Sequence, residues 1–467
     1  MHEGGTEAVT PEVAGTPQQT GANAGRWRQH LSTAIVSLVG VSAGAVSGWA
    51  SPMLVTLKSP SSPVGPMGLT EMSLLETLPT LASIVAIYLY GGTLDLLGRK
   101  WTGYLAAAPF IVGSVFNTCA TLPYHIYIGR SLQGLGVAGM SISGPSLLSE
   151  VVHSSRRGAA LTYSPVVTNL ATLLIFVQGE FLSYRAFNIC SLLVTMWFPL
   201  FFYFLPESPY YLASKKKNVE AHKSLLWYRG GMKDVADEEM KAVMSVSRQN
   251  AKFTDIFKLR SSRRAVVIVS FMFSFQQLGG SAIIVGYSSL MFDELDGFLS
   301  PMTSLIIMTS VKLLSSYFCS FIVDRMSRRF LLISTFLAMS ITLTVISICY
   351  YFSDHLNPPD LAWILLGGLC IYFLSFGVGI GTLPGVIGNE IVVPEIKGSL
   401  SMITGTITLV AMTLCLQAYP FVNQYIGTYA NFAIAAVINL IGCLISYILI
   451  PETRGIPLAD IIEQLDR

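Results

Sequence analysis

Charged residues are scarce in this chain of 467 residues, because Asp, Glu, Lys and Arg together make up only 12% of it. Hydrophobic residues make up 52%, and the mean hydropathy is +0.59. A soluble protein of this length needs a largely polar surface, so this composition argues against one and indicates a membrane protein. The net charge of only +2 gives no indication of a nucleic-acid partner.

Catalytic and metal-binding motifs are also lacking. The sequence contains no nucleophile elbow, no His-Glu-x-x-His and no phosphate-binding loop, and its seven cysteines have no regular spacing. The stretch 134–139 (GLGVAG) matches the dinucleotide-binding pattern, but that pattern needs a strand before it and a helix that starts at the glycines. These glycines lie inside an apolar run, where small residues let helices pack closely. We therefore expect no enzyme, no cofactor and no metal.

Long apolar stretches make up most of the sequence. A helix needs about 20 apolar residues to cross a bilayer, because its backbone groups must then be satisfied internally. Twelve stretches meet this need and predict an all-α membrane protein with twelve transmembrane helices. They lie near 31–56, 73–93, 101–119, 125–148, 160–182, 186–205, 264–292, 301–323, 330–352, 361–388, 399–419 and 430–450.

The basic residues predict the topology, because Lys and Arg near the ends of spans are retained in the cytoplasm. With both termini inside, the cytoplasmic segments carry 25 of the 29 basic residues. The predicted order along the chain is a disordered cytoplasmic tail, a six-helix bundle, a cytoplasmic linker of short helices, a second six-helix bundle and a cytoplasmic C-terminal tail. These parts cover 1–26, 27–205, 206–263, 264–450 and 451–467.

Three pairs of charged motifs recur in the same order about half a chain apart. Their offsets are 324 − 95 = 229, 390 − 150 = 240 and 451 − 206 = 245. Such a repeat indicates two copies of one membrane unit, as in many secondary transporters. The motifs are Asp95-Leu-Leu-Gly-Arg99-Lys100 with Asp324-Arg-Met-Ser-Arg328-Arg329, Glu150 and Arg157 with Glu390 and Lys397, and Pro206-Glu207-Ser208 with Pro451-Glu452-Thr453.

The repeated charges suggest a role in gating. Acidic residues at cytoplasmic helix ends can pair with arginines of the neighbouring turn, and such pairs can form in one arrangement of the halves and break in another. The alternative is that the charges only enforce topology and stay solvated. The predicted gating residues are Asp95, Arg99, Glu150, Arg157, Asp324, Arg328, Glu390, Lys397 and Glu452.

From about Leu31 to Gly455 the chain resembles the sugar porters of the major facilitator superfamily. Within that family, Pro165 and Asn169 are most like the insect facilitated trehalose transporters. The motifs that carry the resemblance are those above together with Gly48-Trp-Ala-Ser-Pro52, Gly129-Arg130 with Gly134, Gln276-Gln277-x-x-Gly280, and Pro384 with Glu390.

The resemblance implies the major facilitator fold, with two six-helix bundles around a central cavity that opens alternately to each side. It also implies a carrier of the plasma membrane that acts on a sugar, either a hexose or a trehalose-like disaccharide. Membrane lipids are its expected surroundings; the sequence does not determine the oligomeric state, for which a monomer is the expectation. The residues expected to bind substrate are Gln276, Gln277, Tyr287, Lys312, Asn169 and Thr408.

Much of the family's usual sugar-contacting set is replaced. Where the family has asparagines in the seventh and eighth spans, this chain has Ala282 and Lys312. Gly385 stands in place of a tryptophan, and Thr408-Leu409 in place of an asparagine–tryptophan pair. Lys312 stands out, because a lysine at a helix centre costs roughly 2.5–3.5 kcal/mol and usually faces a cavity or a partner. Two alternatives to sugar transport therefore stay open: a different solute that is anionic, or a sugar sensor that does not transport.

The energy source can also be inferred. Proton-driven relatives place a carboxylate in the first span opposite the arginine at position 130, whereas residues 31–57 contain no Asp or Glu. A coupled cycle needs a group that takes up and releases a proton. We therefore expect facilitated diffusion, with Glu71 and Glu76 in the second span as the carboxylates that could overturn this expectation.

Overall fold

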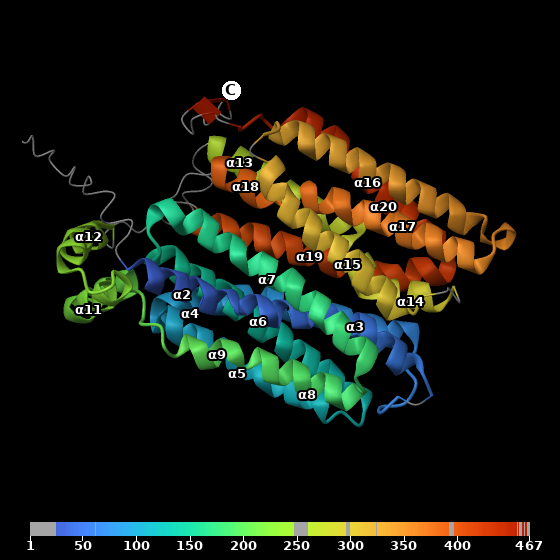
Figure 1. The fold of residues 1–467 in the computed structure, drawn as a ribbon, viewed down its shortest axis with the longest axis horizontal. Helices are drawn as coiled ribbons and strands as arrows, with labels where there is room; N and C mark the ends of the chain where they lie inside the picture. The colour runs from blue at the N-terminus through green and yellow to red at the C-terminus, as the bar shows by residue number, and fades with distance from the viewer. Residues whose placement is uncertain are drawn as a thin grey trace, which may run out of the picture.

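The computed structural model describes residues 25–60, 62–246, 260–295, 299–323, 325–391, 397–454, 456, 460–461 and 463–464. Nearly all of the tail predicted for 1–26 lies outside these residues, as does Asp324 of the predicted gating set. The side chains of Arg157 and Lys397 are likewise outside the described part. Over the described residues, long helices follow one another along the chain (Figure 1).

Each of the twelve predicted spans corresponds to one long helix or to consecutive helical pieces. In the first half of the chain these are α2 (Arg26–Ser37) with α3 (Val39–Lys58), α4 (Leu69–Leu97), α5 (Arg99–Thr118), α6 (Pro123–Val151), α7 (Ser154–Phe181), and α8 (Tyr184–Thr195) with α9 (Trp197–Phe202). In the second half they are α13 (Arg260–Gln276) with η2 (Gln277–Ser281) and α14 (Ala282–Asp293), α15 (Pro301–Ile322), α16 (Arg328–Tyr351), α17 (Pro358–Val378) with α18 (Leu383–Ile391), α19 (Lys397–Tyr425) and α20 (Thr428–Leu449).

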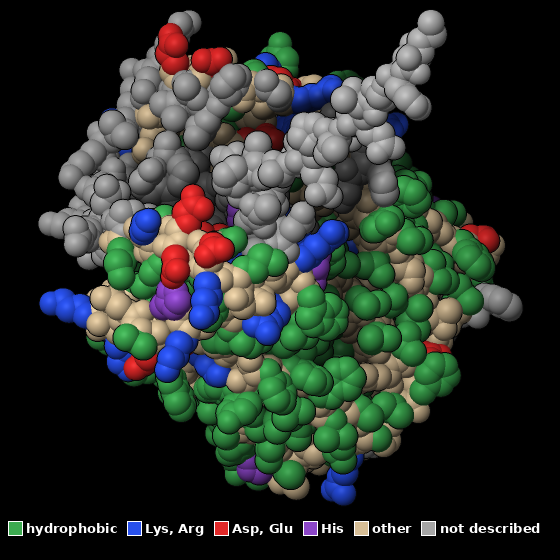
Figure 2. Space-filling model, turned by 60° about the vertical axis from the view of Figure 1, so that its left-hand side comes forward, with side chains coloured by type: hydrophobic (Ala, Val, Ile, Leu, Met, Phe, Trp, Pro, Cys, Tyr) green, Lys and Arg blue, Asp and Glu red, His purple; other side chains and the backbone are tan. Residues whose placement is uncertain are grey.

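Nine of the helical segments in the described part are long and apolar enough to cross a bilayer by composition alone. The remaining three spans, α5, α6 and α7, are 20 to 29 residues long but carry more glycine and polar residues. Figure 2 shows hydrophobic side chains over a broad continuous area, with most of the visible charges gathered in one region. The prediction of an all-α membrane protein with twelve transmembrane helices is confirmed.

The spans form two bundles that lie side by side (Figure 1). In the N-terminal half α6 packs on α4 and α5, and α3 packs on α7; in the C-terminal half α16 packs on α20 and α17, and α15 packs on α17. Three helix pairs join the halves: α4 with α19, α3 with α14, and α7 with α15. The two halves therefore meet along α3, α4 and α7 on one side and α14, α15 and α19 on the other.

Three short helices between the halves, α10 (Pro209–Ser214), α11 (Asn218–Tyr228) and α12 (Lys233–Val246), lie at one end of the bundles (Figure 1). We call this the linker end and the opposite one the far end. The short helices share their own small apolar core and are anchored to the N-terminal bundle. The Arg229 guanidinium donates to the Val151 carbonyl at 2.8 Å, and the Tyr228 hydroxyl donates to the Pro206 carbonyl at 2.7 Å.

Glycines let α6 approach its neighbours closely, as predicted for 134–139. A Cβ at Gly134 would lie 2.2 Å from the Pro79 carbonyl oxygen in α4, and a Cβ at Gly136 would lie 2.5 Å from the Phe110 Cβ in α5. These glycines are in the middle of a 29-residue helix rather than between a strand and a helix. Their role in packing is therefore confirmed, because no larger residue fits at these contacts.

Replacing Gly136 with Val should destabilise the N-terminal bundle, because the added Cβ overlaps Phe110 and α5 must move away from α6. The expected loss is about 1–3 kcal/mol, the usual cost of overpacking. It is measured as a lower thermal unfolding midpoint of the purified chain in detergent. Gly92→Val is the matched control, since a Cβ at Gly92 in α4 meets nothing within 4 Å. Equal midpoints for the two variants would contradict the packing role.

Candidate functional site

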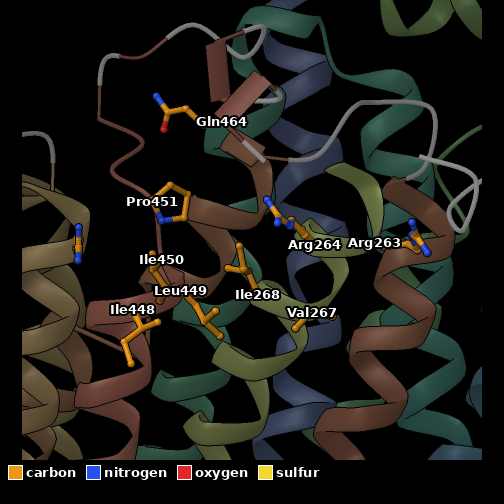
Figure 3. A pocket seen from close by; sticks show the side chains of 10 residues that line it. Arg263, Arg264, Val267, Ile268, Ile448, Leu449, Ile450, Pro451 and Gln464 are labelled. Atoms are coloured by element: carbon orange, nitrogen blue, oxygen red, sulfur yellow. The ribbon is translucent and has the colours of Figure 1, made fainter. Parts of the chain in front are cut away.

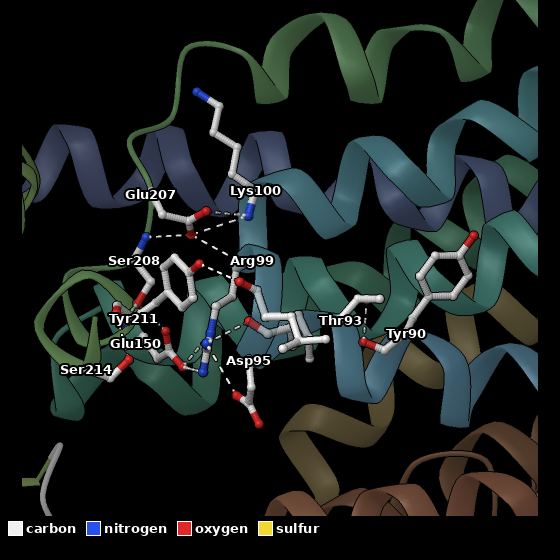
Figure 4. Close-up of polar contacts among 12 residues, drawn as sticks. Tyr90, Thr93, Asp95, Arg99, Lys100, Glu150, Glu207, Ser208, Tyr211 and Ser214 are labelled. Atoms are coloured by element: carbon white, nitrogen blue, oxygen red, sulfur yellow. Dashed lines mark hydrogen bonds and ion pairs between the residues drawn. The ribbon is translucent and has the colours of Figure 1, made fainter. Parts of the chain in front are cut away.

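A network of charges at the linker end ties together the ends of three segments in the N-terminal half (Figure 4). The Arg99 guanidinium donates to Glu150 Oε1 from Nη2 at 2.7 Å and from Nε at 3.0 Å. Asp95 lies 3.8 Å from the same guanidinium. Ser208 donates its hydroxyl to the other Glu150 oxygen, and Glu207 accepts the backbone N–H of Arg99 at 3.1 Å. Five residues of the predicted motifs thus meet at one place.

The C-terminal half repeats this network. The Arg328 guanidinium donates to Glu390 Oε1 at 3.2 Å, and the Thr453 hydroxyl donates to Glu390 Oε2 at 2.5 Å. Glu452 accepts the backbone N–H of Arg328 at 3.1 Å and a hydrogen bond from the Ser327 hydroxyl. The sequence repeat is therefore also a repeat of contacts, in which each carboxylate has the same kind of partner.

One position differs between the two networks. Gly98 has φ 94°, and a Cβ there would lie 2.5 Å from Glu207 Oε2. Ser327 takes the corresponding place in the C-terminal half and has ordinary extended backbone with φ −60°. Its hydroxyl then supplies a hydrogen bond to Glu452 that Gly98 cannot supply to Glu207. The equivalent carboxylates Glu207 and Glu452 are thus held by slightly different sets of hydrogen bonds.

The networks are largely shielded from solvent, unlike ordinary surface pairs. The side chains of Arg99 and Glu150 are 15% and 17% exposed, whereas that of Asp95 is 85% exposed. Burial raises the pKa of Glu452, but hydrogen bonds from Ser327 and from backbone N–H groups outweigh this effect and hold its pKa below the usual value. Each described ion pair of the predicted set lies within one half, so none of these pairs joins the halves.

Polar contacts join the halves along α4 and α19, where Thr80 and Thr413 lie 2.7 Å apart and Thr406 donates to the Tyr88 hydroxyl at 3.1 Å, and also at the far end. The hydroxyls of Ser51 in α3 and Ser289 in α14 are 3.1 Å apart, and Ser289 also donates to the Ser51 carbonyl at 2.5 Å. Lys58 and Asp293 lie 4.0 Å apart, and Ser300, just before α15, donates to a Glu180 oxygen of α7 at 3.0 Å. In this conformation polar contacts therefore hold the halves together at the far end.

The seventh span is interrupted near its middle by η2, a short π-helix. Gly280 has φ 106°, a conformation that favours glycine, so the helix is irregular next to the Gly279 carbonyl. This carbonyl accepts hydrogen bonds from the Tyr372 hydroxyl at 3.0 Å and from Asn439 Nδ2 at 2.9 Å. Side chains from α17 and α20 therefore satisfy backbone that the break exposes. The sequence analysis did not single out Tyr372 or Asn439, and only the Gly279-Gly280 pair signalled the break.

Gln276 connects this interruption to a second one. The tenth span breaks between α17 and α18, and Gln276 Nε2 donates to the carbonyls of Ile380 at 3.0 Å and Gly381 at 3.2 Å within that break. Among the described residues, Gln277 donates to Gln276 Oε1 alone, at 3.4 Å. Both glutamine side chains are partly exposed. Gln276 is thus held by backbone, whereas Gln277 keeps most of its hydrogen-bonding capacity.

The other predicted substrate residues differ in how they are held. Tyr287 is fully buried, donates its hydroxyl to the Leu416 carbonyl at 3.1 Å and stacks on Tyr419 with ring centroids 4.3 Å apart. Thr408 donates to the Thr404 carbonyl of its own helix at 2.6 Å. Asn169 is partly exposed in α7. Tyr287 therefore belongs to the packing between α14 and α19 in this conformation.

Lys312 projects from α15 toward aromatic rings of α17. Its ammonium nitrogen lies 5.4 Å from the ring centre of Phe373 and 5.6 Å from that of Phe376. Within the described part of the chain it forms no ion pair. Phe376 precedes Ile380 by four residues, about one helical turn. Lys312 and Gln276 thus contact the tenth span at positions about one helical turn apart.

A buried cluster around Arg130 was only partly anticipated. The Arg130 guanidinium donates to the carbonyls of Leu75 at 3.0 Å and Val46 at 3.1 Å, and it lies 4.9 Å from the centre of the Trp49 ring. Glu76 is 4% exposed and close enough to Arg130 to act on it electrostatically. Backbone carbonyls and a ring thus surround Arg130, and Glu76 of the second span is a nearby carboxylate.

We expect the Arg99–Glu150 pair to show strong energetic coupling, because both side chains are mostly shielded from water. In a double-mutant cycle with Arg99→Ala and Glu150→Ala, the coupling in unfolding free energy should be about 1–3 kcal/mol. The control cycle uses Lys217 and Glu220, an exposed pair 3.4 Å apart, for which about 0.3–0.5 kcal/mol is expected. Coupling no larger than in the control would mean that the network charges are effectively solvated.

Comparisons with known proteins agree with this architecture. The model of the sugar (and other) transporter family matches residues 31–465. The facilitated trehalose transporter Tret1 of Aedes aegypti is 28% identical over 443 residues, which are 93% of this chain and 55% of the relative, so the chain spans about half of that protein. Tret1 of Apis mellifera ligustica is 25% identical over 93% of this chain and 87% of the relative.

Solved structures show the same fold. The partially occluded inward open conformation of the xylose transporter XylE from E. coli has a TM-score of 0.78 at 17% identity, covering 92% of this chain and 100% of that chain. A crystal structure of a D-xylose–proton symporter has a TM-score of 0.72 at 18% identity, over 92% and 99% of the two chains. The predicted resemblance to the major facilitator sugar porters is confirmed, and the chain belongs to the sugar (and other) transporter family.

Proposed function

We propose that this protein carries a neutral sugar, a hexose or a trehalose-like disaccharide, downhill across the plasma membrane by alternating access. The linker end faces the cytoplasm in this proposal, since Arg and Lys residues gather there. Family membership supports a sugar as the transported solute. The trehalose transporters among the relatives support the disaccharide.

The observation that carries the proposal is the meeting of two interrupted helices at Gln276. Transporters place substrate where helices break near the bilayer midplane, because irregular backbone is tolerated only beside protein or a water-filled cavity. Gln277, next to that junction, has an amide oxygen and a second N–H that engage no described side chain and suit a sugar hydroxyl. A buried polar group left unpaired costs about 1–3 kcal/mol, which makes such a contact selective.

The contacts between the halves support alternating access. Opening the far end requires the Ser51–Ser289, Lys58–Asp293 and Glu180–Ser300 contacts to separate. The two arginine–glutamate networks lie within the halves and hold the linker ends of their helices, so that each half moves as a unit. Whether they also act as a latch between the halves, together with Asp324, Arg157 and Lys397, stays a prediction.

Facilitated diffusion is supported by the surroundings of Arg130. Its described hydrogen-bond acceptors are the Leu75 and Val46 carbonyls and the Gln133 amide oxygen, none of which takes up a proton at physiological pH. Residues 31–57 contribute no carboxylate. Among the described residues, Glu76 of α4 is the acidic group that acts on this arginine.

In proteoliposomes the purified chain should equilibrate radiolabelled trehalose or glucose without accumulating either. Imposing a pH gradient should leave the final internal concentration equal to the external one, because no proton moves with the sugar. Glu76→Gln should have the same equilibrium, although its rate can change. The measurement is sugar uptake with and without the gradient, and with the gradient collapsed by a protonophore as the control. Uphill accumulation that requires Glu76 would overturn facilitated diffusion while leaving sugar transport intact.

A second candidate solute is favoured by one observation. The Lys312 ammonium faces two aromatic rings at the level of the Gln276 junction, and cation–π contact leaves its three N–H groups able to donate. An anionic sugar derivative would use these donors, whereas a neutral sugar has no need of the charge. A protein that binds sugar but shows no counterflow would instead be a sensor.

Substitutions at two positions, Gln277 and Lys312, separate neutral from anionic substrates. For a neutral sugar, Gln277→Leu should weaken transport by about 5- to 150-fold, the equivalent of about 1–3 kcal/mol, while Lys312→Met changes it little. For an anionic solute, Lys312→Met should abolish uptake and Lys312→Arg should preserve part of it. Counterflow of glucose, trehalose and glucuronate by the three variants gives the measurement. Unchanged glucose and trehalose counterflow in Gln277→Leu would remove that residue from the sugar site.

A further inference from the structure

A cavity of about 700 Å³ opens at the linker end of the C-terminal half, away from the Gln276 junction. It lies between the start of α13, the start of α16 and the end of α20, with Gln464 of the C-terminal segment on its border. Three arginines line it: Arg263, Arg264 and Arg329. Figure 3 shows the aliphatic side chains gathered on one side of the view and Gln464 on the other.

The aliphatic side of the cavity continues into the lipid-facing surface. Val267 in α13 is 58% exposed, and Ile448 and Leu449 in α20 are 74% and 46% exposed. These residues belong to membrane-spanning helices, so the surface that they expose meets hydrocarbon. The cavity therefore has a basic part at the interface and an apolar part that extends along the membrane side of the helices.

The pseudo-symmetric place in the N-terminal half is covered. Lys100 donates to the Tyr203 carbonyl at 2.7 Å, and Arg28 donates to the Trp227 carbonyl of α11 at 2.8 Å and lies over its ring. In the C-terminal half Arg329 repeats the first contact, donating to the Tyr447 carbonyl. Within the described part of the chain the second contact has no counterpart at Arg263, which is exposed beside the cavity. The repeat thus leaves a basic site open in one half only.

We propose that this cavity binds an anionic membrane phospholipid, with the headgroup phosphate on Arg263, Arg264 and Arg329 and an acyl chain along Val267, Ile448 and Leu449. Arginine guanidinium groups suit phosphate because they donate in a fixed fork. A free phosphate would use the arginines but not the exposed aliphatic residues. The proposed orientation places the site at the cytoplasmic leaflet, where anionic lipids concentrate.

The test measures binding of phosphatidylserine and phosphatidylcholine to the purified full-length chain by native mass spectrometry. Phosphatidylserine should bind about tenfold or more tightly than phosphatidylcholine. Arg263→Gln with Arg264→Gln should weaken phosphatidylserine binding by about 20-fold, since each basic residue near the surface contributes about fivefold. Lys223→Gln with Lys241→Gln is the matched control on the short helices at the same end, and it should change binding less than twofold.

Replacement of Arg263 and Arg264 by lysines keeps the charge and guards against a folding defect; this variant should retain most of the phosphatidylserine binding. Equal affinities for the two lipids, or equal losses in the glutamine variant and its control, would overturn the proposal. Inorganic phosphate serves as the competitor. If a large excess of it displaces phosphatidylserine, and itself binds with the same dependence on Arg263 and Arg264, the site takes free phosphate rather than a lipid.

Discussion

Every backbone N–H and carbonyl at membrane depth must have a partner within the protein, and this constraint governs the architecture of the chain. Regular helix meets it by its own hydrogen bonds. The seventh and tenth spans are interrupted, and the carbonyls exposed there are satisfied by side chains of other helices: Gly279 by Tyr372 and Asn439, and Ile380 by Gln276. The interruptions are therefore stable only in the assembled C-terminal bundle.

The same constraint explains why the interrupted region suits a transport site. Where backbone leaves the helical ladder, nearby polar side chains become permissible at a depth at which they would otherwise be costly. Gln277 and Lys312 are such side chains, and both approach the junction without being fully engaged by described neighbours. In the N-terminal half, by contrast, the buried guanidinium of Arg130 donates to backbone carbonyls and lies against the Trp49 ring.

Duplication has given the two halves a common frame and different surfaces. The Arg99–Glu150 and Arg328–Glu390 pairs have matching partners, even to the hydroxyl that donates to each glutamate. These networks fix the linker ends of each bundle. Away from them the halves diverge: helix α11 covers the basic surface of the N-terminal half, whereas the equivalent surface of the C-terminal half borders an open cavity.

The sequence by itself determined the twelve spans, the two-bundle fold and the family, because hydrocarbon requires long apolar helices and the charged motifs recur in matched order. It also predicted the Arg99–Glu150 and Arg328–Glu390 pairs, because both partners of each pair belong to the repeated motifs. Tertiary structure alone decided the remaining contacts. Lipid-facing and protein-facing surfaces are both apolar, so the pattern does not fix how each helix is rotated. The rotation of each helix placed aromatic rings beside Lys312 and buried Glu76. It also brought the Gln276 amide to the backbone carbonyls that accept its hydrogen bonds.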